Sequence, residues 1–231
     1  MRNPWRFGFA RPILMASSVV LLAVTALAQV VWIKRTPGKA PAARSHHAMA
    51  YDTVRKRIVL FGGRAGSRYL DDTWEWDGDT WTERFPKNRP PARVDHAMAY
   101  DASRGRLVLF GGSNPASFFG DTWEWDGTDW TIRYPRSAPT GRARYVMTYD
   151  SSRKRVLLHG SSISSYSSET WEWDGSNWTN WSPPVSPPRD TPTEAMAYDA
   201  SRGRVVLLTS ATIPRSGGRR RSETWEWTFR T

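Results

Sequence analysis

The sequence predicts an all-β fold, a β-propeller of about four four-stranded blades. The first observation behind this prediction is an internal repeat of 49 residues, marked by Tyr51, Tyr100, Tyr149 and Tyr198. The second is the phrase that surrounds each tyrosine: HAMAYDTVRKRIVLFGG, HAMAYDASRGRLVLFGG, YVMTYDSSRKRVLLHGS and EAMAYDASRGRVVLLTS. The third is a tryptophan-rich phrase in each repeat, beginning with DTWEWDGDTW at Asp72. Recurrence at such a period is typical of propellers, in which each repeat is one supersecondary unit.

Each repeat divides into four short strands separated by turn residues. In the first repeat they are expected at His46–Tyr51, Arg57–Phe61, Thr73–Trp76 and Thr80–Phe85. We call them strands a, b, c and d. Strand b, RIVLF, is a nearly continuous apolar run, so it is expected to be buried on both faces. Asp77-Gly78 predicts a tight hairpin between strands c and d, because glycine tolerates positive φ.

These features resemble the kelch repeat of the galactose-oxidase-like propellers. The resemblance rests on a strand that ends in Gly62-Gly63 or Gly111-Gly112, an acidic residue that opens strand c, and Trp81 or Trp130 opening strand d. It covers roughly residues 30–231. Repeats three and four depart from this pattern. Where the first two repeats have FGG, repeat three has HGS at His159 and repeat four has LTS at Leu208.

The strand c tryptophans are expected to be structural. Side chains alternate along a strand, so Trp74 and Trp76 share one face. Recurrence in every blade places Trp74, Trp123, Trp171 and Trp225 at equivalent positions, as a blade-to-blade core requires. A sugar-binding platform, by contrast, would need its tryptophans exposed at one site.

The N-terminal part of the sequence supplies a candidate closing strand. The fourth repeat stops after strand c, and WIKRTP at Trp32 matches WTERFP at Trp81, 49 residues later. Residues 30–37 are therefore expected to complete the last blade and close the ring. The repeats themselves are placed at about 41–86, 90–135, 139–183 and 187–231. The alternatives are a ring completed by a second chain, or a remnant that folds poorly.

Residues 1–28 are expected to be a signal peptide or membrane anchor. Arginines precede an uncharged run from Ile13 to Ile33, and Ala26-Leu27-Ala28 resembles a cleavage site. The domain at 29–231 is then extracytoplasmic, secreted or periplasmic, and anchored to the membrane if the segment is retained.

Composition narrows the functional classes. The chain of 231 residues has no cysteine, which excludes disulfides and thiol chemistry. It also removes the cysteine–tyrosine cofactor implied by the galactose-oxidase resemblance, and no other cofactor is expected. The net charge of +11 is spread through all repeats, and no nucleic-acid-binding motif occurs, so nucleic acid is not favoured as a partner.

Antiparallel order places the b–c and d–a connections on one face, and this loop face is the expected binding face. Its loops offer Tyr69, Phe118, Phe119 and Tyr166 as contact aromatics and Arg219-Arg220-Arg221 as a basic cluster. A ring of candidate ligand-binding residues lies where strand a begins: Arg44, His47, Arg93, His96, Arg142, Tyr145, Arg189 and Glu194. Arginine can offer paired donors to an anion. The same residues can equally serve as framework.

The residues alone leave three functions open. The preferred one is a noncatalytic propeller that binds a protein or a glycan, including an anionic one. The second is an enzyme acting on acidic sugars, implied by exported kelch propellers similar to sialic-acid isomerases. The third is a structural envelope protein. No catalytic arrangement recurs, and His47, His96 and Glu194 from separate blades are not expected to form a metal site.

Overall fold

The computed structural model describes residues 32–141, 145–161, 168–183, 185, 187, 195–212 and 220–228. The chain divides into two compact units, Met1–Arg35 and Thr36–Thr231. The predicted signal or anchor at 1–28 lies outside the described residues. Within the described part, no helix is long and apolar enough to cross a bilayer.

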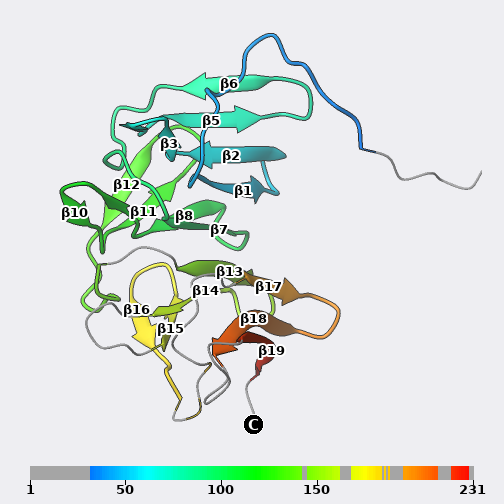
Figure 1. The fold of residues 1–231 in the computed structure, drawn as a ribbon, viewed down its shortest axis with the longest axis vertical. Helices are drawn as coiled ribbons and strands as arrows, with labels where there is room; N and C mark the ends of the chain where they lie inside the picture. Colours follow the sequence, from blue (N-terminus) through cyan, green and yellow to red (C-terminus); the bar gives the residue numbers. More distant parts are fainter. Residues whose placement is uncertain are drawn as a thin grey trace, which may run out of the picture. The chain divides into compact units, whose positions relative to one another are not determined.

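The fold is all-β, as predicted, with antiparallel sheets arranged as the four blades of a β-propeller (Figure 1). Blade 1 contains β1 (Ala48–Asp52), β2 (Arg57–Phe61), β5 (Thr73–Trp76) and β6 (Trp81–Arg84). Blade 2 contains β7 (Ala97–Asp101), β8 (Arg106–Phe110), β11 (Thr122–Trp125) and β12 (Trp130–Arg133). Blade 3 contains β13 (Val146–Asp150), β14 (Arg155–Ser161), β15 (Ser168–Trp173) and β16 (Trp178–Asn180). Blade 4 contains β17 (Ala195–Asp199), β18 (Arg204–Thr212) and β19 (Arg220–Trp227).

The closing strand around Trp32 is not confirmed. Residues 32–37 form no strand, Trp32 is fully exposed, and the sheet of blade 4 has three strands in the described part. Matching register alone does not hold a strand in place, because only pairing along β19 would offset the backbone entropy lost by ordering the segment. Further along the chain, Lys39 Nζ lies 3.2 Å from Glu83 Oε2 of blade 1.

The glycine pairs shape the loop face of blades 1 and 2. Gly62 and Gly63 have φ of 63° and 93°, and a Cβ added to Gly63 would lie 2.8 Å from the carbonyl oxygen of Ser45. The pair separates strand b from a small hairpin, β3 (Arg64–Ala65) with β4 (Arg68–Tyr69). Blade 2 repeats this arrangement with β9 (Ser113–Asn114) and β10 (Ser117–Phe118). Blades 3 and 4 lack the glycine pair, and there strands b and c run on into the loop.

The core lies between the blades and is rich in tryptophan, as expected. Trp125 of strand c and Trp130 of strand d are fully buried between blades 1 and 2. Trp125 Nε1 donates to Glu75 Oε1 over 3.2 Å, and Trp130 Nε1 donates to Thr73 Oγ1 over 2.9 Å. These bonds satisfy both indole N–H groups inside an apolar core.

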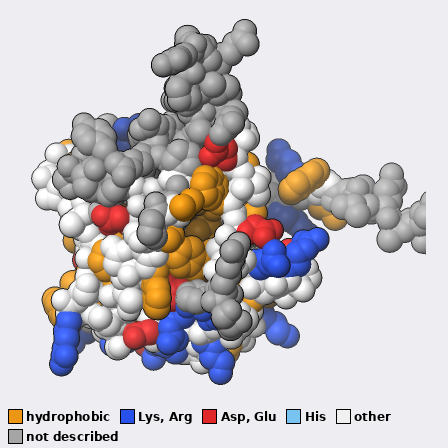
Figure 2. Space-filling view, turned by 90° about the horizontal axis from the view of Figure 1, so that it is seen from below, with side chains coloured by type: hydrophobic (Ala, Val, Ile, Leu, Met, Phe, Trp, Pro, Cys, Tyr) orange, Lys and Arg blue, Asp and Glu red, His pale blue; other side chains and the backbone are white. Residues whose placement is uncertain are grey.

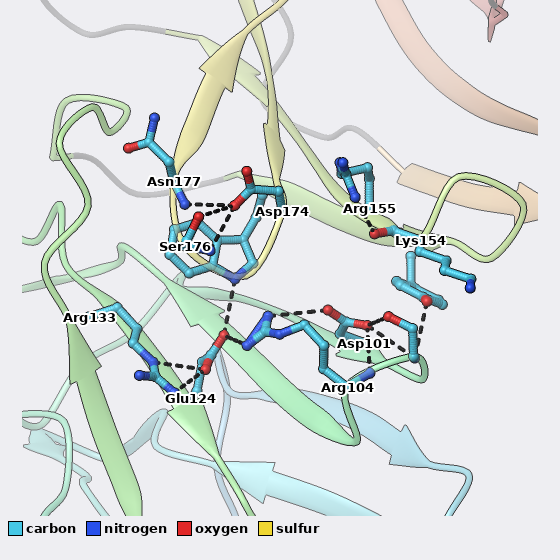
Figure 3. A network of polar contacts seen from close by, with 12 residues as sticks. Asp101, Arg104, Glu124, Arg133, Lys154, Arg155, Asp174, Ser176 and Asn177 are labelled. Carbon is cyan, nitrogen blue, oxygen red and sulfur yellow. Dashed lines mark hydrogen bonds and ion pairs between the residues drawn. The ribbon is translucent and has the colours of Figure 1, made fainter.

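The next interface repeats this geometry. Trp173 Nε1 donates to Glu124 Oε1 over 3.0 Å, and Trp178 Nε1 donates to Thr122 Oγ1 over 2.9 Å. Arg104 and Arg133 also hold Glu124, from the a–b turn and from strand d of the same blade (Figure 3). A buried carboxylate is thus compensated by two arginines, as burial of a charge requires.

Candidate functional site

The two ends of the blade sheets carry different connections, as the antiparallel strand order predicts: one end has the b–c and d–a loops, and the other has the short a–b and c–d turns. Hairpins β3–β4 and β9–β10 lie at the ends of their sheets opposite the β1–β2 and β5–β6 turns (Figure 1). Charges on the turn face are paired locally: Arg57 Nη1 lies 3.6 Å from Asp77 Oδ2, and Arg55 Nη1 lies 2.6 Å from Asp52 Oδ2. The loop face is therefore where a ligand site is sought.

Arg44 and Arg93, the first two members of the predicted ring, have matching partners. Arg93 Nη1 and Nη2 donate to the two carboxylate oxygens of Asp121 over 2.6 and 2.8 Å. Arg44 makes the same pair of bonds to Asp72, also over 2.6 and 2.8 Å. Each guanidinium donates as well to the carbonyl that follows strand b, Gly111 for Arg93 and Gly62 for Arg44.

In blades 1 and 2 these contacts fix the start of strand c to the segment that precedes strand a. The Arg93 side chain is 0% exposed, and its guanidinium lies 4.1 Å from the centroid of the Phe119 ring. Burial would raise the pKa of Asp72, but hydrogen bonds from Arg44 and Trp74 outweigh this effect and lower it. The donors of both arginines are directed at groups of the protein itself, which is a framework arrangement.

His96 and Tyr145 also occupy one repeated position. His96 packs edge-on against Phe61 at 5.5 Å, and Tyr145 packs likewise against Phe110 at 5.4 Å. Burial, and secondarily the nearby charge of Arg93, lowers the pKa of His96 to about 3. The pKa of His47 is lowered by burial and by Arg44. His96 is thus neutral across the physiological pH range.

Arg142, Arg189 and Glu194, the remaining ring members, lie outside the described residues. Their assignment as ligand-binding groups stays a prediction. Tyr166 and Arg219 of the predicted contact loops are also outside this part, whereas Arg220 and Arg221 lie within β19. Among the residues that the structure describes, no group of His, Asp and Glu is placed to hold a metal ion.

The small hairpins of blades 1 and 2 carry exposed side chains that take no part in the framework contacts of Arg44 and Arg93. Arg64 and Arg68 are exposed, and within the described ranges neither forms an ion pair. Phe118 of β10 is 58% exposed. The sequence predicted Phe118 as a contact aromatic, but it did not single out Arg64 and Arg68 as contact residues. Arg64 and Arg68 follow the glycine pair and lie outside the repeated phrase. This position in a variable loop is the sequence feature that could have identified them.

Both hairpins are held rigidly by backbone bonds. Arg64 and Ser45 exchange N–H···O bonds of 2.9 and 3.0 Å, and Ser113 and Val94 exchange two bonds of 2.9 Å. Gly63 N donates to the carbonyl of Arg93 over 2.9 Å, which joins the first hairpin to blade 2. The exposed side chains are therefore carried by an ordered backbone, which reduces the entropy lost on binding.

A cavity of about 320 Å³ lies between blades 3 and 4. His159 and Thr170 line this cavity. In the strand register they correspond to Phe61 and Thr73 of blade 1, which contact Trp130 of blade 2. Burial lowers the pKa of His159 to about 4. Hydrophobic side chains gather on the face seen from the blade 4 side (Figure 2). The cavity thus occurs where blade 4 lacks a strand d in the described part.

Comparison with known proteins adds no family. No protein-family model matches the chain, and a search of the curated proteins finds no match.

Proposed function

We propose that this chain is a noncatalytic, exported binding propeller of the kelch type, whose loop face takes a glycan or protein ligand. A propeller of rigid blades is compatible with such a role, since ligand contacts can vary on loops while the framework is kept. The kelch assignment is supported by the positive-φ glycine pairs that end β2 and β8. Export is supported by the sequence of residues 1–28.

One observation carries the proposal: the β3–β4 hairpin exposes Arg64 and Arg68, which form no ion pair within the described ranges, and the β9–β10 hairpin exposes Phe118, whereas Arg44 and Arg93 of the framework are paired. Arg64 and Arg68 offer planar donors that suit a carboxylate or sulfate, and the Phe118 ring suits the apolar face of a sugar. Arg64 pairs with Tyr69 and Arg68 pairs with Ala65, so the two arginines project from opposite sides of the β3–β4 hairpin. An anionic glycan that wraps this hairpin is the ligand chemistry that these exposed side chains suit best.

The test uses a matched pair of polymers, polygalacturonate and its neutral methyl ester. Full-length protein should bind the carboxylated polymer and not the ester. Arg64→Glu combined with Arg68→Glu should weaken binding at least about tenfold, which corresponds to 1.4 kcal/mol. Arg89→Glu is the control, because Arg89 is an exposed arginine that already pairs with Asp71. Equal binding of the two polymers, or an unchanged affinity in the double variant, would refute the anionic-glycan proposal.

A further inference from the structure

The blades meet through a repeated interface with two different sides. We call the side of a blade that contacts the preceding blade its leading face, and the side that contacts the next blade its trailing face. In blade 2 the leading face consists of Met98, Tyr100, Trp125 and Trp130. The trailing face of blade 1, which receives it, includes Val59, Phe61, Thr73 and Glu75.

Blades 2 and 3 use the same positions. Met147, Tyr149, Trp173 and Trp178 form the leading face of blade 3, against Val108, Phe110, Thr122 and Glu124. The tyrosines of the leading faces of blades 3 and 4 also reach the a–b turn of the preceding blade: Ser103 N donates to Tyr149 Oη over 3.1 Å, and Ser152 N donates to Tyr198 Oη over 3.2 Å. One set of contacts thus recurs from blade to blade.

The leading face of blade 1 has the same residues but remains uncovered. Met49 and Tyr51 are 51% and 52% exposed, whereas their counterparts Met98 and Tyr100 are 8% and 7% exposed. Space around Gly78 is open, although its counterpart Gly127 is packed against Arg55 of the preceding blade. Met49, Tyr51 and the space around Gly78 are thus open on blade 1, while Trp76 and Trp81 are half-buried, whereas Trp125 and Trp130 are fully buried.

The trailing face of blade 4 is uncovered in a complementary way. Leu208 occupies the register position of Phe61 and Phe110, yet it is 47% exposed where both phenylalanines are 0% exposed. Thr224 and Glu226 correspond to Thr73 and Glu75, which accept tryptophan N–H groups, and both are exposed. This face carries the acceptors that Trp76 and Trp81 of a following blade 1 would use.

We infer that the leading face of blade 1 docks on the trailing face of blade 4 of a second copy of this chain. The contact continues an interface already formed inside the chain, with the same residue types at each position. Within the described ranges both faces are exposed in a single chain, so the blades of one copy do not bury them. Because the two faces differ, the association is head-to-tail, and two copies can bury all four faces in a closed ring.

The test is native mass spectrometry of the full-length chain, released from detergent micelles. The wild-type protein should appear as a dimer. Tyr51→Asp breaks the leading face, and Leu208→Asp breaks the trailing face, so each variant alone should be a monomer, with self-association weakened at least 100-fold. Met49→Asp is a second variant of the leading face. Tyr134→Asp is the control, since Tyr134 is 84% exposed and belongs to neither face.

Mixing the two variants distinguishes this mode from any other. A Tyr51→Asp chain keeps its trailing face and a Leu208→Asp chain keeps its leading face, so the mixture should form a heterodimer through one intact contact. Far-UV circular dichroism checks that each variant is folded. A monomeric wild-type mass at every concentration, which would include closure within one chain, overturns the inference. Dimers that persist in both variants, or a mixture that stays monomeric, also overturn it.

Discussion

Replacing Arg93 by methionine separates a framework role from a ligand-binding role. The change keeps most of the side-chain length and apolar volume but removes the donors to Asp121, Gly111 and Pro91. Asp121 would keep the 2.7 Å bond from Trp123 Nε1. Breaking a buried ion pair by removing one partner costs about 3–5 kcal/mol. The Asp121 side chain is 22% exposed and is therefore partly hydrated, so we expect a loss of about 3 kcal/mol, at the lower end of this range.

The assay is urea unfolding followed by tryptophan fluorescence. A loss of about 3 kcal/mol should lower the midpoint by roughly 1–3 M, given slopes of about 1–3 kcal/mol per M. Arg64→Met is the matched control, since Arg64 is exposed, and it should change stability by less than about 0.5 kcal/mol. Combining Arg93→Met with Asp121→Leu should recover part of the loss, because the unpaired carboxylate is then removed. An Arg93→Met protein as stable as wild type would refute the framework assignment.

Three further predictions concern the blade core and the glycine pair of blade 2. Trp130→Ala should cost about 3–5 kcal/mol in urea unfolding, because it empties a buried site and frees Thr73; a loss below 1 kcal/mol would contradict the blade-core assignment. His96, with its pKa lowered to about 3, binds a proton more weakly when folded than when unfolded, so its contribution to stability is lost as pH falls from about 6.5 to 3. His96→Tyr, which places there the residue found at Tyr145, should flatten that part of the pH–stability curve, and an unchanged slope would argue against a buried neutral histidine. Gly112→Ala should cost at least about 1–3 kcal/mol, because φ is 93° and the added Cβ would lie 2.7 Å from the carbonyl oxygen of Val94; wild-type stability would show that the backbone relaxes.

Much of the fold follows from periodicity. Strand b and strand c of the first blade begin and end at the predicted residues, because the apolar run and the alternating tryptophans define them. The glycine pair on which the kelch resemblance rests ends strand b where the chain approaches closely, since Gly63 has φ of 93° and lies against Ser45 and His47. The β3–β4 and β9–β10 hairpins could not be predicted, since two-residue strands have no periodicity and depend on bonds to Ser45 and Val94.

The site was harder to predict for a physical reason. A recurring arginine before strand a is compatible with either an anion site or an internal ion pair, and spacing alone does not place Asp72 or Asp121 beside it. Similarly, the register of Trp32 shows which side chain would fit the last blade but not whether the segment pairs with β19. Both questions depend on tertiary contacts far apart in the sequence.

The most direct test of the proposed binding face is amide hydrogen exchange of the full-length protein with and without saturating polygalacturonate. We predict slower exchange on binding in the hairpins at 64–69 and 113–118, with the start of strand a around Arg44 and Arg93 already protected in the free protein by its internal bonds. No change in the two hairpins, or ligand-dependent protection confined to the start of strand a, would contradict the assignment of binding to the exposed hairpins.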